Sequence, residues 1–452
     1  MSVKAKDIQY VCSQCGRSEN KWLGRCPDCG SWNTFEEEAV KKNSDTKRAV
    51  ISTATKPISL EDVVIDPQFR FETGISELDR VLGGGVMKGS SVLLGGEPGI
   101  GKSTLMLQVL EKCSHSRRVL YVSGEESPTQ VKLRAQRLGL NLKRIDIFCD
   151  TRLEVLNELL QSAAVDVVVV DSLQTLTSED IPSPAGSVNQ IRACSTLLVG
   201  LCKQLGISLF LVGHVTKEGL LAGPKVIEHL VDTVLYFEQV SSGVRLVRAA
   251  KNRFGSVDEI GIFSMHEKGL SAVSNPSSFF ITDRSGTSIP PGIAYTAVIE
   301  GSRTFLVEIQ ALTTSAKNGV SRIYSDRIDS ARVTRVAAIL ERHAQLRLSD
   351  QDIYINVAGG MKLSEVSIEL PLALALFSAL SSKSLPDGLI SYGELSLAGE
   401  VRNVSFPDKR EKAAKELGFK RSIVPRASTH TSLVQHACST IKEALHVCAT
   451  MQ

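Results

Sequence analysis

The sequence lacks a long apolar run, a signal-peptide pattern and a large net charge. No apolar run approaches the roughly 18 residues that a membrane-spanning helix requires, so we expect no membrane partner. The opening Met1-Ser2-Val3-Lys4-Ala5-Lys6 leads into no apolar core of the signal-peptide type. The formal net charge is only +3 over 452 residues, so any nucleic-acid surface must be a local patch. We therefore expect a cytoplasmic protein.

The cysteines do not form a disulfide framework. The sequence has 10 cysteines, of which one group is tightly clustered near the N-terminus and the others are scattered. This distribution fits a reducing compartment. Apolar residues make up 42% and charged residues 22%, which is ordinary for a globular protein. The length suggests about three domains.

A glycine-rich segment organises the chain. An apolar strand ending near Leu94 runs into a turn and then a helix that is predicted to begin near Lys102. The turn matches the phosphate-loop pattern G-x-x-x-x-G-K-[ST], whose backbone N–H groups and helix N-terminus bind phosphate. In this pattern the lysine reaches the β- and γ-phosphates of ATP and the following hydroxyl ligates Mg²⁺. The predicted nucleotide-binding residues are Gly96, Glu97, Pro98, Gly99, Ile100, Gly101, Lys102, Ser103 and Thr104.

Strand-like and helix-like segments alternate after this loop, which predicts an α/β unit with a mostly parallel sheet. The run Val167–Val170 is a buried strand that ends in Asp171, a Walker B pattern that places a carboxylate near Mg²⁺. A solvated strand-end aspartate is the alternative. Strand ends also carry Glu125, Glu126 and His214. Because strand C-termini meet at one crevice, we expect either glutamate to act as the base, and we interpret His214 as a sensor of the γ-phosphate. The alternative is that His214 is a surface or core histidine.

Two cations follow a later strand, at Lys251 and Arg253. If both stay on the strand, its two-residue period points them to one face. We interpret them as a pair that acts on the nucleotide of a neighbouring subunit. The alternative is a solvated edge hairpin that basic residues protect.

The cysteine cluster consists of two CxxC-Gly knuckles. Cys12, Cys15, Cys26 and Cys29 have the spacing of a tetrahedral Cys₄ site, and we expect structural Zn²⁺ there. A segment this small has little core, so the metal would supply much of its folding energy. Three aromatic residues are expected to pack around it, namely Trp22, Trp32 and Phe35.

The order of these motifs resembles the bacterial RadA/Sms DNA-repair ATPase family. The likeness rests on the cysteine knuckles, the phosphate loop, Ser123–Ser127, Asp171-Ser172, Gly213–Lys217 and Lys251–Gly255. It implies a RecA-like core that forms a hexameric ring around single-stranded DNA. It also implies help with strand exchange and branch migration of branched recombination intermediates, alongside the RecA recombinase.

The C-terminal region resembles the proteolytic domain of Lon proteases, through Val357–Gly360, Ala375–Leu380 and Gly393–Val401. Lon enzymes use a serine that a lysine activates. The serine position falls on Ser367, but the lysine position falls on Asp408, with Lys409 one residue out of register. We therefore expect a non-proteolytic scaffold that could bind DNA.

These observations predict a fold of class α/β with a zinc ribbon, a RecA-like ATPase core and a Lon-protease-like domain. The predicted ranges are 1–38 for the zinc module, 39–57 for a basic linker, 58–273 for the ATPase domain and 274–452 for the Lon-like domain.

We expect a DNA-dependent ATPase of recombinational repair, with DNA contacts in the loop 177–191 and at Arg192 and Lys217. Two other functions stay open, an ATP-dependent protease of the Lon type and a nucleotide-switched regulator resembling KaiC.

Overall fold

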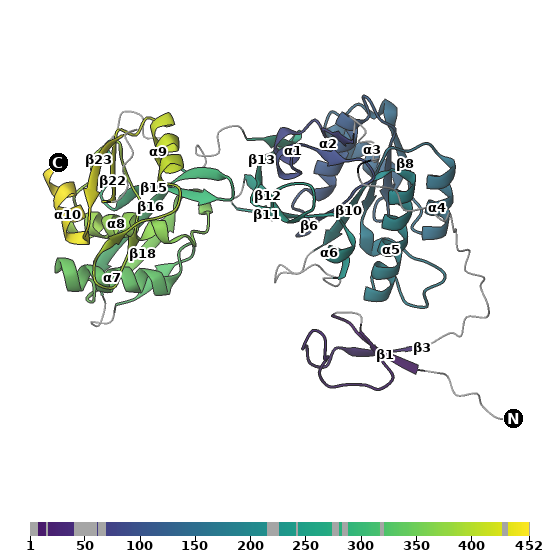
Figure 1. Ribbon diagram of the computed structural model, residues 1–452, viewed down its shortest axis with the longest axis horizontal. Helices are drawn as coiled ribbons and strands as arrows, with labels where there is room; N and C mark the ends of the chain where they lie inside the picture. The colour runs from purple at the N-terminus through teal and green to yellow at the C-terminus, as the bar shows by residue number, and fades with distance from the viewer. Residues whose placement is uncertain are drawn as a thin grey trace. The chain divides into compact units, whose positions relative to one another are not determined.

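The computed structural model describes residues 8–14, 17–39, 61, 69–214, 226–240, 243–273, 280–282, 288–316, 321–426 and 433–451 (Figure 1). The chain divides into two compact units. The first comprises Met1–Glu238 with Arg245–Ala272, and the second comprises Gln239–Val244 with Val273–Gln452. The predicted domain boundary, between 273 and 274, lies one residue from this division. None of the described helices is both long and apolar enough to cross a membrane.

The N-terminal module is a small antiparallel sheet in the order β2-β1-β3. Its strands are β1 (Ile8–Cys12), β2 (Ser18–Glu19) and β3 (Phe35–Ala39). The predicted linker, 39–57, lies outside the described residues apart from Ala39, which ends β3.

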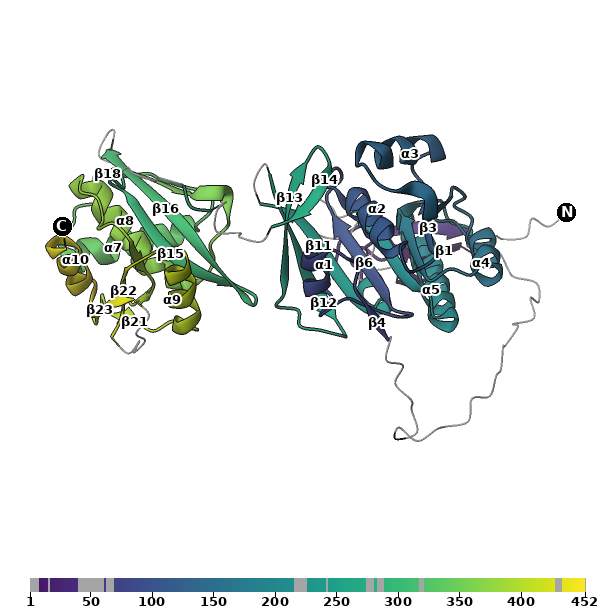
Figure 2. The same cartoon turned by 90° about the horizontal axis from the view of Figure 1, so that it is seen from above.

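The ATPase core is built on a nine-stranded sheet in the order β14-β13-β12-β11-β6-β10-β9-β7-β8. Its strands are β6 (Ser91–Gly96), β7 (Val119–Ser123), β8 (Ile145–Phe148), β9 (Val167–Asp171), β10 (Ser208–His214), β11 (Thr233–Gln239), β12 (Val244–Asn252), β13 (Ile260–His266) and β14 (Gly269–Ala272). The strands from β8 to β11 pair in parallel, as predicted, whereas β13 and β14 pair antiparallel. Figure 2 shows β12, β13 and β14 continuing the sheet beyond β11. A two-stranded ribbon precedes the sheet, formed by β4 (Arg70–Phe71) and β5 (Val86–Met87).

Helices cover both faces of this sheet (Figure 1). They are α1 (Ser76–Val81), α2 (Lys102–Cys113), α3 (Pro128–Arg137), α4 (Leu153–Ser162), α5 (Val188–Leu205) and α6 (Val226–Leu230). Side chains of α1, α2 and α3 pack in one apolar cluster, and those of α4, α5 and α6 pack in another. In β9, Val167 and Val169 enter the first cluster, while Val168 and Val170 enter the second. This alternation explains the uninterrupted valine run, because both faces of the strand are covered.

Local signals in the sequence set the helix ends. Ser127 and Gln130 form a reciprocal capping box at the start of α3, with a proline in the first turn. At α5 the Ser187 hydroxyl accepts from the backbone N–H of Gln190, and Gly206 ends the helix at φ 69°. These caps hold both helices in the register that buries their apolar faces.

The second unit is a separate α/β domain. Its sheets have the orders β15-β16-β18-β17, β19-β22-β23 and β20-β21. The strands are β15 (Ile293–Glu300), β16 (Arg303–Ser315), β17 (Ile323–Ser325), β18 (Gln351–Val357), β19 (Leu389–Ser391), β20 (Glu394–Leu395), β21 (Val401–Arg402), β22 (Arg421–Pro425) and β23 (Val434–Cys438). The helices are α7 (Ser330–Ala344), α8 (Glu369–Ser381), α9 (Pro407–Glu416) and α10 (Ile441–Thr450). Helix α8 is almost wholly buried and packs against β15 and β16.

Candidate active site

The phosphate loop joins β6 to α2, and α2 begins at Lys102 as the sequence predicts. Close contacts restrict two glycines of the loop, and one of them, Gly101, also has a left-handed backbone conformation. A Cβ on Gly96 would lie 2.7 Å from the carbonyl oxygen of Phe237, and one on Gly101, at φ +114°, would lie 2.6 Å from the methyl carbon of Met265. Larger residues would therefore displace the loop from its neighbours.

The remainder of the loop faces outward. Glu97, Pro98 and Gly99 are exposed, while Ile100 is buried beneath them. The buried guanidinium of Arg245 donates from Nε to the Ile100 carbonyl at 3.4 Å. The contact with Arg245 thus anchors the loop at Ile100. The exposed residues Glu97, Pro98 and Gly99 leave backbone N–H groups of the loop accessible to an anion.

Lys102 is buried within this turn. Its Nζ donates to the carbonyl oxygens of Gly96 at 2.7 Å and Glu97 at 2.9 Å. Burial lowers the pKa of Lys102, and the nearby charges of Asp171 and Glu125 oppose that effect. The ammonium is therefore held inside the loop, where phosphate oxygens can replace the carbonyls as partners.

His214 connects Lys102 to Glu125. Its Nδ1 lies 3.3 Å from Lys102 Nζ, and its Nε2 lies 3.2 Å from Glu125 Oε1. An ammonium only donates, so Nδ1 must accept and Nε2 carries the proton that it donates to the carboxylate. One neutral tautomer therefore satisfies both contacts.

Glu125 is held by a second donor, because the Ser172 hydroxyl donates to its Oε1 at 2.5 Å. Partial burial disfavours the charged form of Glu125, but the hydrogen bonds from Ser172 and His214 and the Lys102 charge outweigh this effect, and its pKa is lowered. The carboxylate is thus ionised, oriented and 47% exposed.

Glu126 has a different environment. Its carboxylate is paired with Arg134 of α3, and its carbonyl accepts from the Ser123 hydroxyl at 2.7 Å. The two adjacent glutamates are therefore not equivalent, and Glu125 is the one bonded to His214. The sequence left this choice open.

Asp171 ends β9 and is buried. The Tyr121 hydroxyl on β7 donates to its Oδ2 at 2.5 Å. Burial, together with the Asp171 charge, raises the pKa of Tyr121, so the phenol remains a donor. Sequence reasoning missed Tyr121, which lies in an apolar strand and resembles a core residue.

Strand register explains why these groups share one edge of the sheet. Gly96 pairs with His214, and Asp171 pairs with Val212 on one side and Ser123 on the other. Because these strands are parallel, the residues that follow them meet at the same carboxyl edge. The phosphate loop, Asp171, Glu125 and His214 thus lie at one edge of the sheet, with Ser103 and Thr104 in the first turn of α2.

Lys251 and Arg253 have different environments. Lys251 is near the end of β12, whereas Arg253 is beyond it, so the condition that both stay on the strand is not met. Lys251 Nζ donates to the carbonyl oxygens of Glu228 at 2.8 Å, Val231 at 2.7 Å and His229 at 3.3 Å. Burial and the Arg253 charge lower the pKa of Lys251, against smaller opposing effects of acidic neighbours.

Arg253 is more exposed than Lys251. Its side chain is 56% exposed, and its Nη1 lies 3.4 Å from Asp232 Oδ1. The segment continues with Phe254 and Gly255. The Arg70 guanidinium donates to the Phe254 carbonyl at 2.8 Å. A Cβ on Gly255 would lie 2.9 Å from the Cα of Gly83.

The predicted DNA-binding residues are only partly described. Lys217 lies outside the described residues, and Arg192 is exposed on α5. The loop before α5 is anchored by Gln190, whose amide donates to three loop carbonyls at 3.0 to 3.1 Å. This loop also carries two exposed acids, Glu179 and Asp180.

The N-terminal module brings three of its cysteines together. The Sγ atoms of Cys12, Cys26 and Cys29 all lie within 4.8 Å of one another, and those of Cys12 and Cys29 are 3.7 Å apart. Cys15 lies outside the described residues. Zn–S bonds of about 2.3 Å in a tetrahedron place neighbouring sulfurs about 3.8 Å apart, so this group fits a thiolate-bound metal.

The aromatic residues of this module behave differently from one another. Phe35 is buried, as expected. Trp22 is half exposed and donates from its indole to the Phe35 carbonyl at 3.1 Å. Trp32 is 69% exposed and carries the guanidinium of Arg25 over its ring, and its packing around the metal stays a prediction.

In the second unit, Ser367 contacts an arginine. Both Ser367 and Arg410 are fully buried, and Arg410 Nη1 donates to Ser367 Oγ at 3.1 Å. Arg410 also pairs with Glu365. Asp408 and Lys409 are exposed, so the cation beside the serine is two residues beyond the position expected from the sequence.

Comparison with known proteins agrees with this architecture. The KaiC family model matches residues 71–147, the rubredoxin metal binding domain matches 10–37, and subunit ChlI of Mg-chelatase matches 323–428. The proteins named DNA repair protein RadA from Treponema pallidum (strain Nichols) and Bacillus subtilis (strain 168) are 47% and 46% identical to the chain. The first match covers 94% of both chains and the second covers 93% of both.

These matches confirm the predicted fold, which comprises a zinc ribbon, a RecA-like P-loop ATPase core with a mostly parallel sheet, and a Lon-protease-like α/β domain. The P-loop core binds ATP with Mg²⁺ and hydrolyses it. The chain belongs to the DNA repair protein RadA family.

Proposed function

We propose that the protein is a DNA-dependent ATPase of recombinational DNA repair, which acts in the cytoplasm on single-stranded DNA and branched intermediates. We propose further that it helps strand exchange and branch migration alongside the RecA recombinase. The relatives' name supports the repair role. The observation that carries the proposal is the chain of contacts from Lys102 through His214 to Glu125, beside the phosphate loop.

In this proposal the chain's own groups divide the work of hydrolysis. Lys102 would bind the β- and γ-phosphates, and Ser103 and Asp171 would hold Mg²⁺. Bound Mg²⁺ neutralises phosphate charge during the transfer. The Tyr121 hydroxyl fixes the orientation of the Asp171 carboxylate.

Glu125 is the proposed base that orients the attacking water. Its carboxylate is ionised and exposed, and two donors hold one of its oxygens. The second oxygen can then accept from water. Glu126 is a weaker candidate because its carboxylate is already paired with Arg134.

His214 is the proposed sensor of the γ-phosphate. It contacts both the lysine that binds phosphate and the glutamate that orients water. When phosphate oxygens attract Lys102, the Nδ1 atom of His214 loses its donor, and the imidazole can turn toward the phosphate. This movement would release Glu125 only when nucleotide is bound.

We propose that Lys251 and Arg253 complete the site of a neighbouring subunit in a hexameric ring. Arg253 supports this idea because its guanidinium is exposed and projects beyond the end of β12. A guanidinium supplied from a neighbour stabilises charge on the transferred phosphoryl group. Subunit assembly would thereby control turnover.

The DNA contacts are proposed at Arg192, Lys217 and the loop before α5. Arg192 is exposed, which supports its assignment. The acids of the loop would repel phosphate, so within this region we expect the cations to provide most of the affinity. Backbone charge without base-specific contacts fits a motor that moves along any sequence.

Zn²⁺ is the proposed metal of the N-terminal module, with Cys12, Cys15, Cys26 and Cys29 as ligands. The sulfur spacing and the match to a rubredoxin metal binding domain support a tetrahedral thiolate site. Among its described residues the module has only a few buried apolar side chains, so metal binding would supply much of its folding energy.

We propose that the C-terminal domain is a scaffold without protease activity. Arginine cannot act as a neutral base, because it stays protonated in proteins. Arg410 therefore cannot activate Ser367, and the burial of Ser367 also excludes a peptide from its hydroxyl. This geometry disfavours the alternative of a Lon-type protease.

The proposal is tested by measuring ATP hydrolysis with and without single-stranded DNA, over protein concentrations that span assembly. We expect DNA to accelerate hydrolysis, and the acceleration to require assembled protein. Turnover that is indifferent to DNA at every concentration would instead favour the KaiC-like regulator. A casein digestion in parallel tests the protease alternative.

A further inference from the structure

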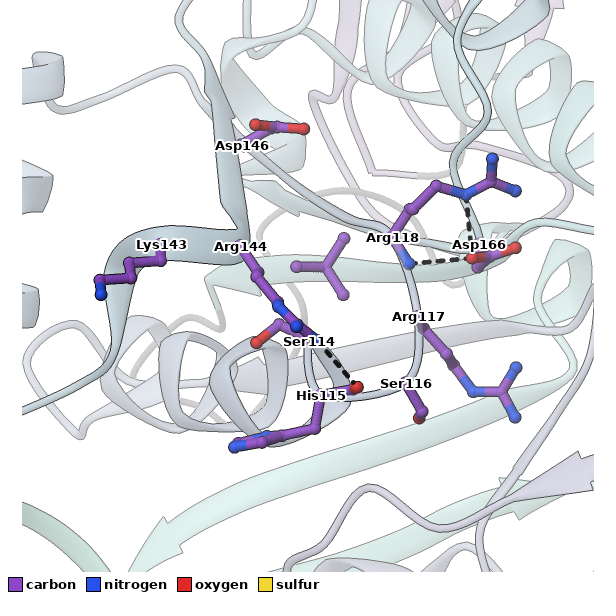
Figure 3. A pocket seen from close by; sticks show the side chains of 10 residues that line it. Ser114, His115, Ser116, Arg117, Arg118, Lys143, Arg144, Asp146 and Asp166 are labelled. Atoms are coloured by element: carbon purple, nitrogen blue, oxygen red, sulfur yellow. Dashed lines mark hydrogen bonds and ion pairs between the residues drawn. The ribbon is translucent and has the colours of Figure 1, made fainter.

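A basic hollow of 630 Å³ lies in the ATPase core, away from the nucleotide site. Four cationic side chains line it, from Arg117, Arg118, Lys143 and Arg144, against two carboxylates, Asp146 and Asp166. Figure 3 shows Lys143 and Arg144 on one side and Arg117 and Arg118 on the other.

Parallel strand pairing creates this cluster. The first residues of β7, β8 and β9 are in register, since Val119 pairs with Ile145 and with Val167. Arg118 and Arg144 directly precede two of these residues, so both lie at the amino edge of the sheet. Glu125 follows the opposite end of β7, about 15 Å away at 3.3 Å per residue. The hollow is therefore distinct from the nucleotide site.

The four cations of the hollow outnumber its two carboxylates, so part of the positive charge is not offset within the lining. Arg118 is paired with Asp166 at 3.4 Å. Among the described residues, Lys143, Arg144 and Arg117 have no carboxylate within ion-pair distance. Arg144 donates to the His115 carbonyl at 3.1 Å, and Arg117 stacks over a phenyl ring. The Arg117 charge also acts on Asp166, so Lys143 and Arg144 are the cations most available to an anion, and the lining as a whole stays positive.

The lining indicates an extended polyanion rather than a small nucleotide. Lys143 and Arg144 are exposed, and the only apolar side chain in the lining is that of Val119. The lining has no phenyl, phenol or indole ring, and its one aromatic side chain is the imidazole of His115, so it offers little surface on which successive unpaired bases could stack. Duplex DNA presents phosphates outward and hides its bases, so its backbone suits this surface.

We propose that this hollow, formed by Arg117, Arg118, Lys143 and Arg144, binds the phosphate backbone of duplex DNA. The inference rests on the proposed function, in which the substrate is a branched intermediate with duplex arms. The hollow would hold a duplex arm while the opposite edge of the sheet carries the nucleotide chemistry.

The test compares two double variants of the full-length protein. K143A/R144A removes two cations of the hollow, and K132A/K203A removes two exposed cations from α3 and α5 as a matched control. Binding to a short fluorescent duplex is measured between roughly 50 and 200 mM salt, because each phosphate contact contributes about −0.9 to the slope of log K against log salt. Thermal unfolding verifies that each variant is folded.

We expect the slope of log K against log salt for K143A/R144A to become shallower by about 1.8. The ratio of the wild-type to the variant affinity for duplex DNA should then fall roughly tenfold between the lowest and the highest salt concentration. The control should keep the slope of the wild type. Unchanged duplex affinity and slope in K143A/R144A would overturn the proposal, as would a loss confined to single strands. An unchanged duplex slope with weaker binding of polyglutamate would assign the hollow to an acidic protein instead.

ATP hydrolysis stimulated by single-stranded DNA should persist in K143A/R144A. Its absence from the wild type as well would contradict the proposed function. Duplex binding is measured without ATP hydrolysis, so it still supports or overturns the role of the hollow in that case. Failure of the proposed function and failure of the duplex-binding proposal are therefore distinguishable.

Discussion

Tyr121→Phe tests how the Asp171 carboxylate is held. The phenol is 1% exposed and donates to Asp171 Oδ2 at 2.5 Å. The substitution removes only the hydroxyl and keeps the ring that fills the core. A hydrogen bond to a charged group contributes about 1.5–3 kcal/mol, which corresponds to a factor of about 10 to 100 in an equilibrium constant. A loss of metal affinity or activity by this factor is typical when the hydrogen-bond partner of a metal ligand is removed.

We therefore expect the Mg²⁺ concentration for half-maximal ATP hydrolysis to rise about 10- to 100-fold in Y121F. The assay is steady-state hydrolysis at fixed ATP with Mg²⁺ as the variable. Tyr392→Phe is the matched control, because Tyr392 is also a buried tyrosine that donates to a carboxylate, Glu411, at 3.4 Å in the other unit. An unchanged Mg²⁺ midpoint in Y121F, with unfolding as in the wild type, would refute the positioning role. An equal shift in both variants would do the same.

The remaining predictions concern the other parts of the site. Lys102→Ala should abolish hydrolysis with the fold intact by thermal unfolding, and retained turnover would overturn the site assignment. Ser172→Ala removes a donor that lowers the Glu125 pKa, so the pKa should rise and the acidic limb of the kcat profile should move to higher pH, whereas an unmoved limb would exclude Glu125 as the base. Mixing inactive Arg253→Ala with inactive Lys102→Ala should restore hydrolysis if sites are shared between subunits, and mixtures that stay inactive would contradict sharing. Because both tryptophans lie in the cysteine module, a zinc chelator should change tryptophan emission while unfolding of the core is unchanged.

Motifs with fixed spacing were predictable from the sequence. The start of α2 at Lys102 and the placement of Asp171 at the end of β9 follow from glycine positions and from an apolar run of strand length. The burial of that run on both faces also follows, because alternate valines enter two different clusters. Such features depend on neighbours in the chain, which a sequence displays directly.

Side-chain direction depends on residues far along the chain and was not predictable. Glu125 and Glu126 follow the same strand, and their contacts with Ser172 and Arg134 decide which one faces the site. Likewise, Arg410 reaches the buried serine only because α9 packs against β15 and β16, which no local spacing reveals. Tyr121 was missed because a strand of apolar residues gives no sign that one of them donates to a carboxylate.

The environments of Lys251, near the end of β12, and of Arg253, just beyond it, differ more than their motif suggests. The sequence presents Lys251 and Arg253 as an equivalent pair, but the three donors of the Lys251 ammonium have three carbonyl partners at the end of α6 and just beyond it. A cation at a helix C-terminus also interacts favourably with the helix dipole, so Lys251 is suited to anchor the segment. Arg253 has one weak ion pair and an exposed guanidinium, and it can reach outward at little cost. Arg253 is therefore the group expected to act on a neighbour's nucleotide, while Lys251 holds it in position.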